Sequence, residues 1–176
     1  MKMMTSAQAA KELKRLNEER DALLSAEVRA SVFTAAIQED IESARPDYDY
    51  EATFDDLRAI EMKIIRLKHS ISQFNLTTKV PGFGMTIDEM LVYIPQQTAL
   101  KKKLDKMRSR LPKERINNGF SRTSNFIEYN YCNYDVKKVQ SDFEEASKRL
   151  AEAQMALDRI NTTVEFEADI IRPFRN

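Results

Sequence analysis

Residues 135–164 read DVKKVQSDFEEASKRLAEAQMALDRINTTV, and this stretch decides the fold class. Its apolar residues recur at alternating steps of three and four, the heptad spacing of a helix that packs along another helix. The positions are Val136, Val139, Phe143, Ala146, Leu150, Ala153, Leu157, Ile160 and Val164. We therefore expect a long helix from about Asp135 to Asn161, with a second helix covering its apolar seam.

The composition also favours a helical protein. The chain has 176 residues, which suits one domain, and it contains only three glycines and five prolines. Its 28 basic residues balance its 28 acidic residues, so the molecule has no net attraction for nucleic acid or an anionic membrane. We find no apolar run of signal-peptide or membrane-spanning type, and Cys132 is a single cysteine. These features predict a cytoplasmic protein.

Three further helices are expected upstream. Thr5 or Ser6 can cap the first helix. Residues 53–56 (TFDD) are typical of a second helix start, whose seam continues to about residue 75. Residues 86–89 (TIDE) form a full capping box, which predicts the start of a third helix that ends near Pro112.

The connecting segments contain short runs with strand-like composition. Residues 29–36 are β-branched and partly alternating, which slightly favours a strand, although continued helix also fits. Residues 77–80, 126–132 and 163–166 are also expected to be extended. Short links make neighbouring helices antiparallel, which would place 29–36 beside 126–132, and 77–80 beside 163–166. The resulting prediction is a mainly α single domain, 1–176: an antiparallel four-helix, coiled-coil-like bundle with a short two-stranded β cap at each end.

An internal repeat is a further hypothesis. A shift of 86 residues places the seam of the second helix on that of the last helix, with Asn75 on Asn161 and Thr77 on Thr163. Two heptad seams can always be brought into register, so coincidence also explains the match. The shared Asn-x-Thr ending favours duplicated helical hairpins, 5–80 and 86–166.

Charge is unevenly distributed along the chain. Residues 39–61 are strongly acidic and residues 101–115 strongly basic. We expect the two stretches to neutralise each other, within one subunit or between two. Phosphate-backbone binding by the basic stretch is the alternative. The candidate interaction residues are Lys101, Lys102, Lys103, Lys106 and Arg108 on the basic side, and Asp47, Asp49 and Glu51 on the acidic side.

An aromatic cluster precedes the last helix. Tyr129 and Tyr131 belong to it and are further candidate interaction residues, in a ligand platform or, more in keeping with a bundle, in a plug or an oligomer contact. His69 has no second ligand at metal-site spacing, and Cys132 has no histidine nearby in the sequence. We therefore expect no catalytic residues, no cofactor and no metal.

The order of these parts resembles a family of small bacterial proteins labelled septicolysin-like. The residues that carry the resemblance are Tyr48-Asp49-Tyr50 in the first connection, 75–78 at the end of the second helix, and Thr86-Ile87-Asp88 at the start of the third. A final coiled helix that ends in Asn and Thr completes the match. The family label derives from a cytolysin name, so the resemblance implies membrane activity.

Together these patterns predict a non-enzymatic, self-associating helical scaffold or assembly protein that forms a homo-oligomer. We expect neither a membrane nor a nucleic acid as its partner. The resemblance supplies one alternative, a membrane-active, cytolysin-like protein. The basic stretch 101–115 supplies the other, nucleic-acid binding.

Overall fold

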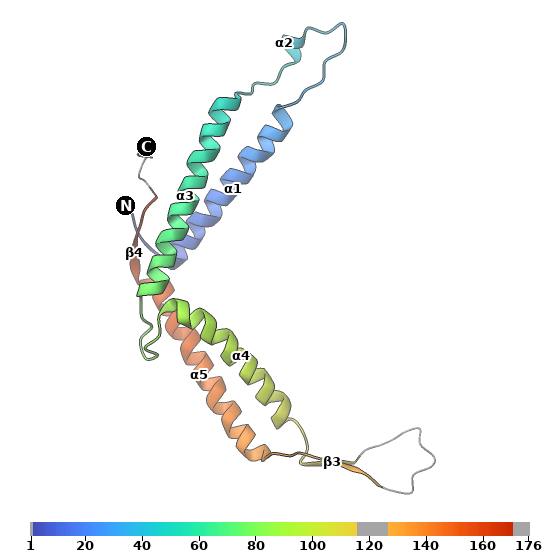
Figure 1. The fold of residues 1–176 in the computed structure, drawn as a ribbon, viewed down its shortest axis with the longest axis vertical. Coiled ribbons are helices and arrows are strands. Elements are labelled where there is room, and N and C mark those ends of the chain that lie inside the picture. The colour runs from blue at the N-terminus through green and yellow to red at the C-terminus, as the bar shows by residue number, and fades with distance from the viewer. Residues whose placement is uncertain (1, 116–126, 171–176) are drawn as a thin grey trace. The chain divides into compact units, whose positions relative to one another are not determined.

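The computed structural model describes residues 2–115 and 127–170 and divides the chain into two compact units (Figure 1). Unit 1 comprises Met1–Thr78 and Arg159–Asn176, and unit 2 comprises Lys79–Asp158. The described elements are β1 (Lys2–Thr5), α1 (Ser6–Ala30), α2 (Ile41–Ala44), α3 (Tyr50–Thr77), α4 (Ile87–Arg108), β2 (Lys113–Arg115), β3 (Tyr129–Tyr131), α5 (Val136–Thr163) and β4 (Glu165–Ala168). The prediction of a mainly α protein is confirmed, and the described residues contain two antiparallel two-stranded sheets.

In unit 1, helices α1 and α3 lie side by side and share a core (Figure 1). The buried apolar side chains of these two helices are Ala9, Leu16, Ile60, Ile64, Leu67 and Phe74. Strands β1 and β4 form an antiparallel sheet, from Lys2 opposite Ala168 to Thr5 opposite Glu165. This sheet contributes Met4 and Phe166 to the core, and the Phe166 ring stacks on Phe74 with centroids 4.6 Å apart.

The helix starts of unit 1 follow capping chemistry. Thr5 caps α1 as expected: its Oγ1 accepts from the Gln8 backbone N–H at 3.3 Å, and the Gln8 side chain accepts from the Thr5 N–H at 3.0 Å. The predicted start of α3 at residues 53–56 was wrong. Asp49 caps this helix instead, accepting from the Ala52 N–H at 3.0 Å, because a carboxylate one turn earlier already satisfies the free backbone donors.

The predicted strand at 29–36 is absent, and its predicted pairing with 126–132 was wrong. Helix α1 continues to Ala30, and residues 31–36 are irregular. Strand β3 lies within 126–132, although Phe126 is outside the described residues, and it pairs with β2. Both strands of this sheet come from the α4–α5 connection, so they pair at a smaller loop-closure cost than distant segments would.

The predicted pairing of 77–80 with 163–166 was also wrong. Lys79 instead bridges to Thr86 across a turn in which Gly82 and Gly84 adopt positive φ angles of 82° and 67°. The segment after α5 forms β4, which pairs with β1, a strand that the sequence analysis missed.

In unit 2, helices α4 and α5 lie side by side (Figure 1). The capping box at Thr86 is confirmed: the Glu89 N–H donates to Thr86 Oγ1 at 3.2 Å, and the Thr86 N–H donates to Glu89 Oε2 at 2.6 Å. The α5 helix matches its prediction closely, and most of its seam is buried. The buried seam residues in this unit are Val139, Ala146, Leu150, Ala153 and Leu157, whereas Val136 and Phe143 are half-buried.

The pairing of α1 with α3, and of α4 with α5, describes two helical hairpins. A single four-helix bundle goes beyond these two units and stays a prediction, as does the internal duplication. None of the helices in the described ranges is both long and apolar enough to cross a membrane.

Candidate interaction site

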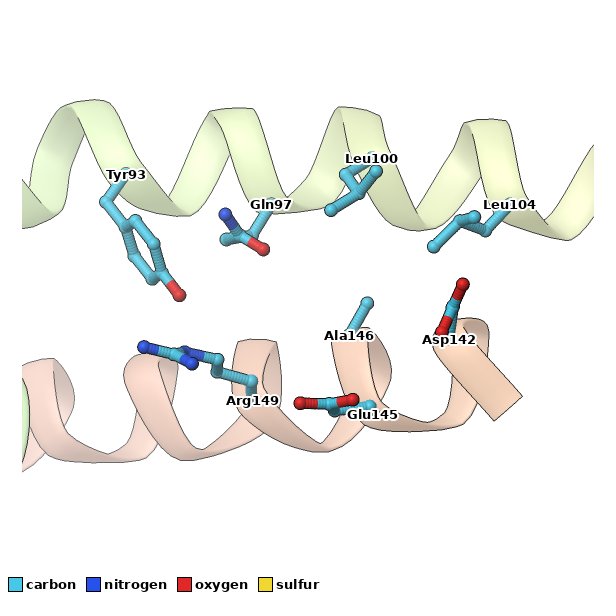
Figure 2. Close-up of a pocket in the computed structure, with 8 residues that line it drawn as sticks. All are labelled: Tyr93, Gln97, Leu100, Leu104, Asp142, Glu145, Ala146 and Arg149. Atoms are coloured by element: carbon cyan, nitrogen blue, oxygen red, sulfur yellow. The ribbon is translucent and has the colours of Figure 1, made fainter. Parts of the chain in front are cut away.

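A groove of about 510 Å³ runs between α4 and α5 within unit 2 (Figure 2). Helix α4 lines it with Tyr93, Gln97, Leu100 and Leu104, and α5 lines it with Asp142, Glu145, Ala146 and Arg149. The α4 residues follow one another at steps of four, three and four, which is a heptad face. Leu100 in this face is still 39% exposed. Helix α5 therefore covers only part of the apolar face that α4 presents.

The reason for the groove lies in side-chain size. Figure 2 shows Ala146 of α5 across the groove from Leu100, with Gln97 beside it on α4. A methyl group cannot fill the space that a larger seam residue such as Leu150 fills elsewhere along α5. The polar amide of Gln97 also makes this part of the α4 face less apolar than the part at Leu104. The result is a gap in the contact between the helices.

The charged residues of the groove are segregated along α5. Asp142 forms an ion pair with Lys138 at 2.6 Å, and this hydrogen bond, together with the charge of Glu145, raises the pKa of Lys138. Arg149 makes no ion pair within residues 2–115 and 127–170. Along the α5 rim, Asp142 thus lies at one end, Glu145 lies in the middle beside Ala146, and the other end carries the Arg149 guanidinium, which its own hairpin leaves unpaired.

The basic stretch 101–115 is partly used in packing α4 against α5. Arg108 lies over the Phe143 ring, 3.8 Å from its centroid, and donates to Gln140 Oε1 at 3.2 Å. Arg108 also pairs with Asp105 at 2.8 Å, one turn earlier on α4. Lys101 lies 5.9 Å from the same Phe143 ring. Of the predicted interaction residues on this stretch, only Lys102, Lys103 and Lys106 are fully on the surface.

The end of the basic stretch meets the aromatic cluster in the β2–β3 sheet. The Lys113 ammonium lies 4.0 Å from the centroid of Tyr129 and 5.4 Å from that of Tyr131. Tyr134 ties the segment between β3 and α5 to α4, because its hydroxyl donates to the Met107 carbonyl at 2.9 Å. The basic and aromatic residues lie apart in the sequence, and the pairing of β2 with β3 brings them together.

The acidic candidates belong to unit 1. Asp49 is the N-cap of α3, Glu51 is exposed in the first turn of that helix, and Asp47 is exposed in the connection before it. The basic candidates belong to unit 2. Mutual neutralisation of the acidic and basic stretches therefore stays a prediction.

A second, smaller pocket of about 330 Å³ in unit 1 contains His69, beside Ser70 and Glu167. Ser70 connects two elements here: its hydroxyl donates to the Arg66 carbonyl at 3.1 Å and accepts from the Asp169 N–H at 3.2 Å. Among the residues that the structure describes, no group of three or more His, Cys, Asp or Glu side chains is arranged to hold a metal ion.

The fold and these surfaces define a class: a mainly helical protein of two hairpin units with small antiparallel sheets. No protein-family model matches the chain, and no curated protein matches it either. Among solved structures, it is similar to the crystal structure of a functionally unknown conserved protein from Corynebacterium diphtheriae. The TM-score is 0.54 at 15% sequence identity, over 94% of this chain and 100% of that one. This likeness is one of fold alone, and the septicolysin-like resemblance stays a prediction.

Proposed function

We propose that this protein is a non-enzymatic, self-associating helical scaffold, active as a homo-oligomer. The observation that carries the proposal is the half-covered heptad face of α4, Tyr93, Gln97, Leu100 and Leu104, which opens onto the groove beside α5. A heptad face is built to pack against other helices. In this hairpin α5 covers only one side of it.

The energetics favour a further layer of helices over this face. Full burial of a leucine side chain is worth roughly 1.5–3 kcal/mol relative to exposure, so Leu100 and its neighbours gain from a partner. Two α4–α5 hairpins from two copies, packed face to face, make an antiparallel four-helix arrangement. Such a bundle takes its helices from two chains, whereas the bundle predicted from the sequence takes all four from one chain.

Unit 1 offers additional apolar surface near the α1–α3 connection. Its exposed side chains are Val28, Val32, Ile37, Ile41, Tyr50 and Phe54. Large apolar side chains that stay exposed within one segment of the chain are available to a protein partner. These side chains would give the protein a second surface for contacts with other molecules, as a component of an assembly requires.

The first test is the mass in solution. We expect light scattering to report at least twice the chain mass of 20.4 kDa at protein concentrations of about 10–50 µM. At such concentrations a dimer with an apolar interface of standard size is populated. The mass should fall on dilution if the assembly is reversible. A mass of one chain over the whole concentration range contradicts the proposal.

Nucleic-acid binding is a second candidate, and one observation favours it. The pairing of β2 with β3 places Lys113 against the rings of Tyr129 and Tyr131, and Tyr131 remains exposed. Basic residues that contact phosphates beside aromatic rings on which bases can stack are the usual elements of a single-strand binding surface.

This candidate is tested by the fluorescence anisotropy of labelled single-stranded DNA and RNA. If the β2–β3 sheet binds them, the double variant Lys113→Ala, Tyr131→Ala should lose about tenfold or more in affinity, since stacking is worth ~1–3 kcal/mol per base. Tyr50→Ala, which removes an exposed tyrosine of unit 1, is the matched control and should have no effect. Under the scaffold proposal the wild-type protein does not bind at ~150 mM salt, and that result removes the candidate.

A further inference from the structure

The groove between α4 and α5 has a charge pattern that is complementary to itself. Asp142 lies at one end of the α5 rim and Arg149 at the other, with Glu145 between them beside Ala146. Asp142 and Arg149 are two helical turns apart, about 10.5 Å along the axis. A surface pairs with its own copy when a two-fold rotation brings its unlike groups together. This spacing allows that rotation.

On α5 the rotation needs an axis across the helix near Ala146. If the α5 helices of two copies lie antiparallel over each other, Arg149 of each copy faces Asp142 of the other when the axis passes between Glu145 and Ala146. Glu145 is one turn from Asp142, so it then lies beside Arg149 of the other copy and also close to Glu145 of that copy. The small side chain of Ala146 at the axis lets the two helices approach closely.

The same rotation is favourable for α4. It exchanges Tyr93 with Leu104 and Gln97 with Leu100, and the midpoints of both pairs fall between the same two residues of α4. Figure 2 shows Gln97 and Leu100 across the groove from Arg149 and Ala146, so the α4 midpoint lies slightly to the Arg149 side of the α5 midpoint, and an axis slightly inclined to the hairpin passes near both. The leucines that are half-covered in one hairpin would thus meet the tyrosine and the glutamine of the other.

We propose that a second copy of this chain docks over the α4–α5 groove, antiparallel and two-fold related, with Arg149 of each copy beside Asp142 and Glu145 of its partner. This inference rests on the proposed self-association and names the surface and geometry that carry it. The occupant is a second copy because the groove supplies both signs of charge at the spacing that a two-fold rotation requires. The docking also provides a partner for Arg149, which has no ion pair elsewhere in the described part of the chain.

The experiment uses two full-length variants with opposite grooves. Arg149→Glu makes the α5 rim entirely acidic, and the double variant Asp142→Lys, Glu145→Lys makes it entirely basic. Each variant alone should dissociate, with a dimer dissociation constant raised by about tenfold or more, because like charges face each other at both ends of the interface. An equimolar mixture of the two should return to the wild-type mass by light scattering and appear as the heterodimer in native mass spectrometry.

Lys148→Glu is the matched control, because it makes the same charge change as Arg149→Glu. Lys148 precedes Arg149 in the chain, is exposed and does not line the groove. It should keep the wild-type mass. Circular dichroism of each variant should show wild-type helix content, and recovery in the mixture shows that both variants are folded. Two results would contradict docking over the groove. One is an oligomeric wild type whose Arg149→Glu variant keeps the wild-type mass, and the other is a mixture of the two variants that stays monomeric. A monomeric wild type contradicts the proposed function itself.

Discussion

Leu150→Asp should unfold the α4–α5 hairpin, and this is the largest single-residue effect that we expect. Leu150 is 6% exposed and lies in the middle of the α5 seam. The substitution removes a buried leucine, which alone costs ~2–5 kcal/mol, and it places a carboxylate at a position that is shielded from water. A destabilisation of this size is comparable with the whole stability of a small domain. Urea unfolding followed by circular dichroism should show lost helix signal before denaturant is added.

The matched control for this experiment is Met155→Asp. Met155 lies on the same helix, it is also apolar, and it is 66% exposed. Its substitution should change the free energy of unfolding by no more than ~0.5 kcal/mol, the usual range for a surface site. If Leu150→Asp kept the wild-type midpoint in urea, α5 would present a different face to its partner helix than the structure shows.

Phe74→Ala should strongly destabilise unit 1. Phe74 is 7% exposed at the end of α3, and its ring stacks on Phe166 of β4 at a centroid distance of 4.6 Å. Truncation of a buried phenylalanine costs ~3–5 kcal/mol. The stacked pair adds ~0.5–1.5 kcal/mol beyond buried area. The contact joins a helix of the core to the β1–β4 sheet, so both should lose stability together.

Leu76→Ala provides the control, since Leu76 is two residues further along α3 and 59% exposed. It should leave the urea midpoint almost unchanged. Hydrogen exchange then localises the effect: in Phe74→Ala, the amides of β1 and β4 should lose protection along with those of the last turns of α3. Protection that persists in the sheet would show that β1 and β4 pair independently of the aromatic contact.

Self-association and the two-fold docking geometry can be tested separately. Self-association requires only that the exposed apolar faces be covered by other copies, in whatever arrangement. The two-fold geometry requires in addition that Arg149 meet Asp142 and Glu145 across the axis. The charge-reversal pair therefore tests a particular orientation, whereas the mass of the wild-type protein tests the function.

Helix starts and seams could be predicted from the sequence because their determinants are local. The capping boxes at Thr5 and Thr86 each lie within one turn, and the spacing from Val139 to Leu157 is a property of one helix. The start of α3 was misplaced because two capping signals, at Asp49 and at Thr53, lie within one turn of each other. The local sequence does not show which of two neighbouring capping residues begins the helix.

Strand partners were decided by the tertiary structure. Segments of three or four residues carry too little side-chain pattern to specify a partner, so pairing depends on which backbone lies within reach. That is why β3 pairs with β2 of the same connection, and β4 with β1 from the other end of the chain. The groove could not be predicted for a related reason: it depends on Ala146 lying across from Leu100, which follows from how α4 and α5 align.

By itself the sequence determined which helices form and which faces they must bury, because the apolar period and the capping residues act within one helix. Which faces remain partly uncovered was decided only by packing, because that depends on the sizes of side chains that meet from distant parts of the chain.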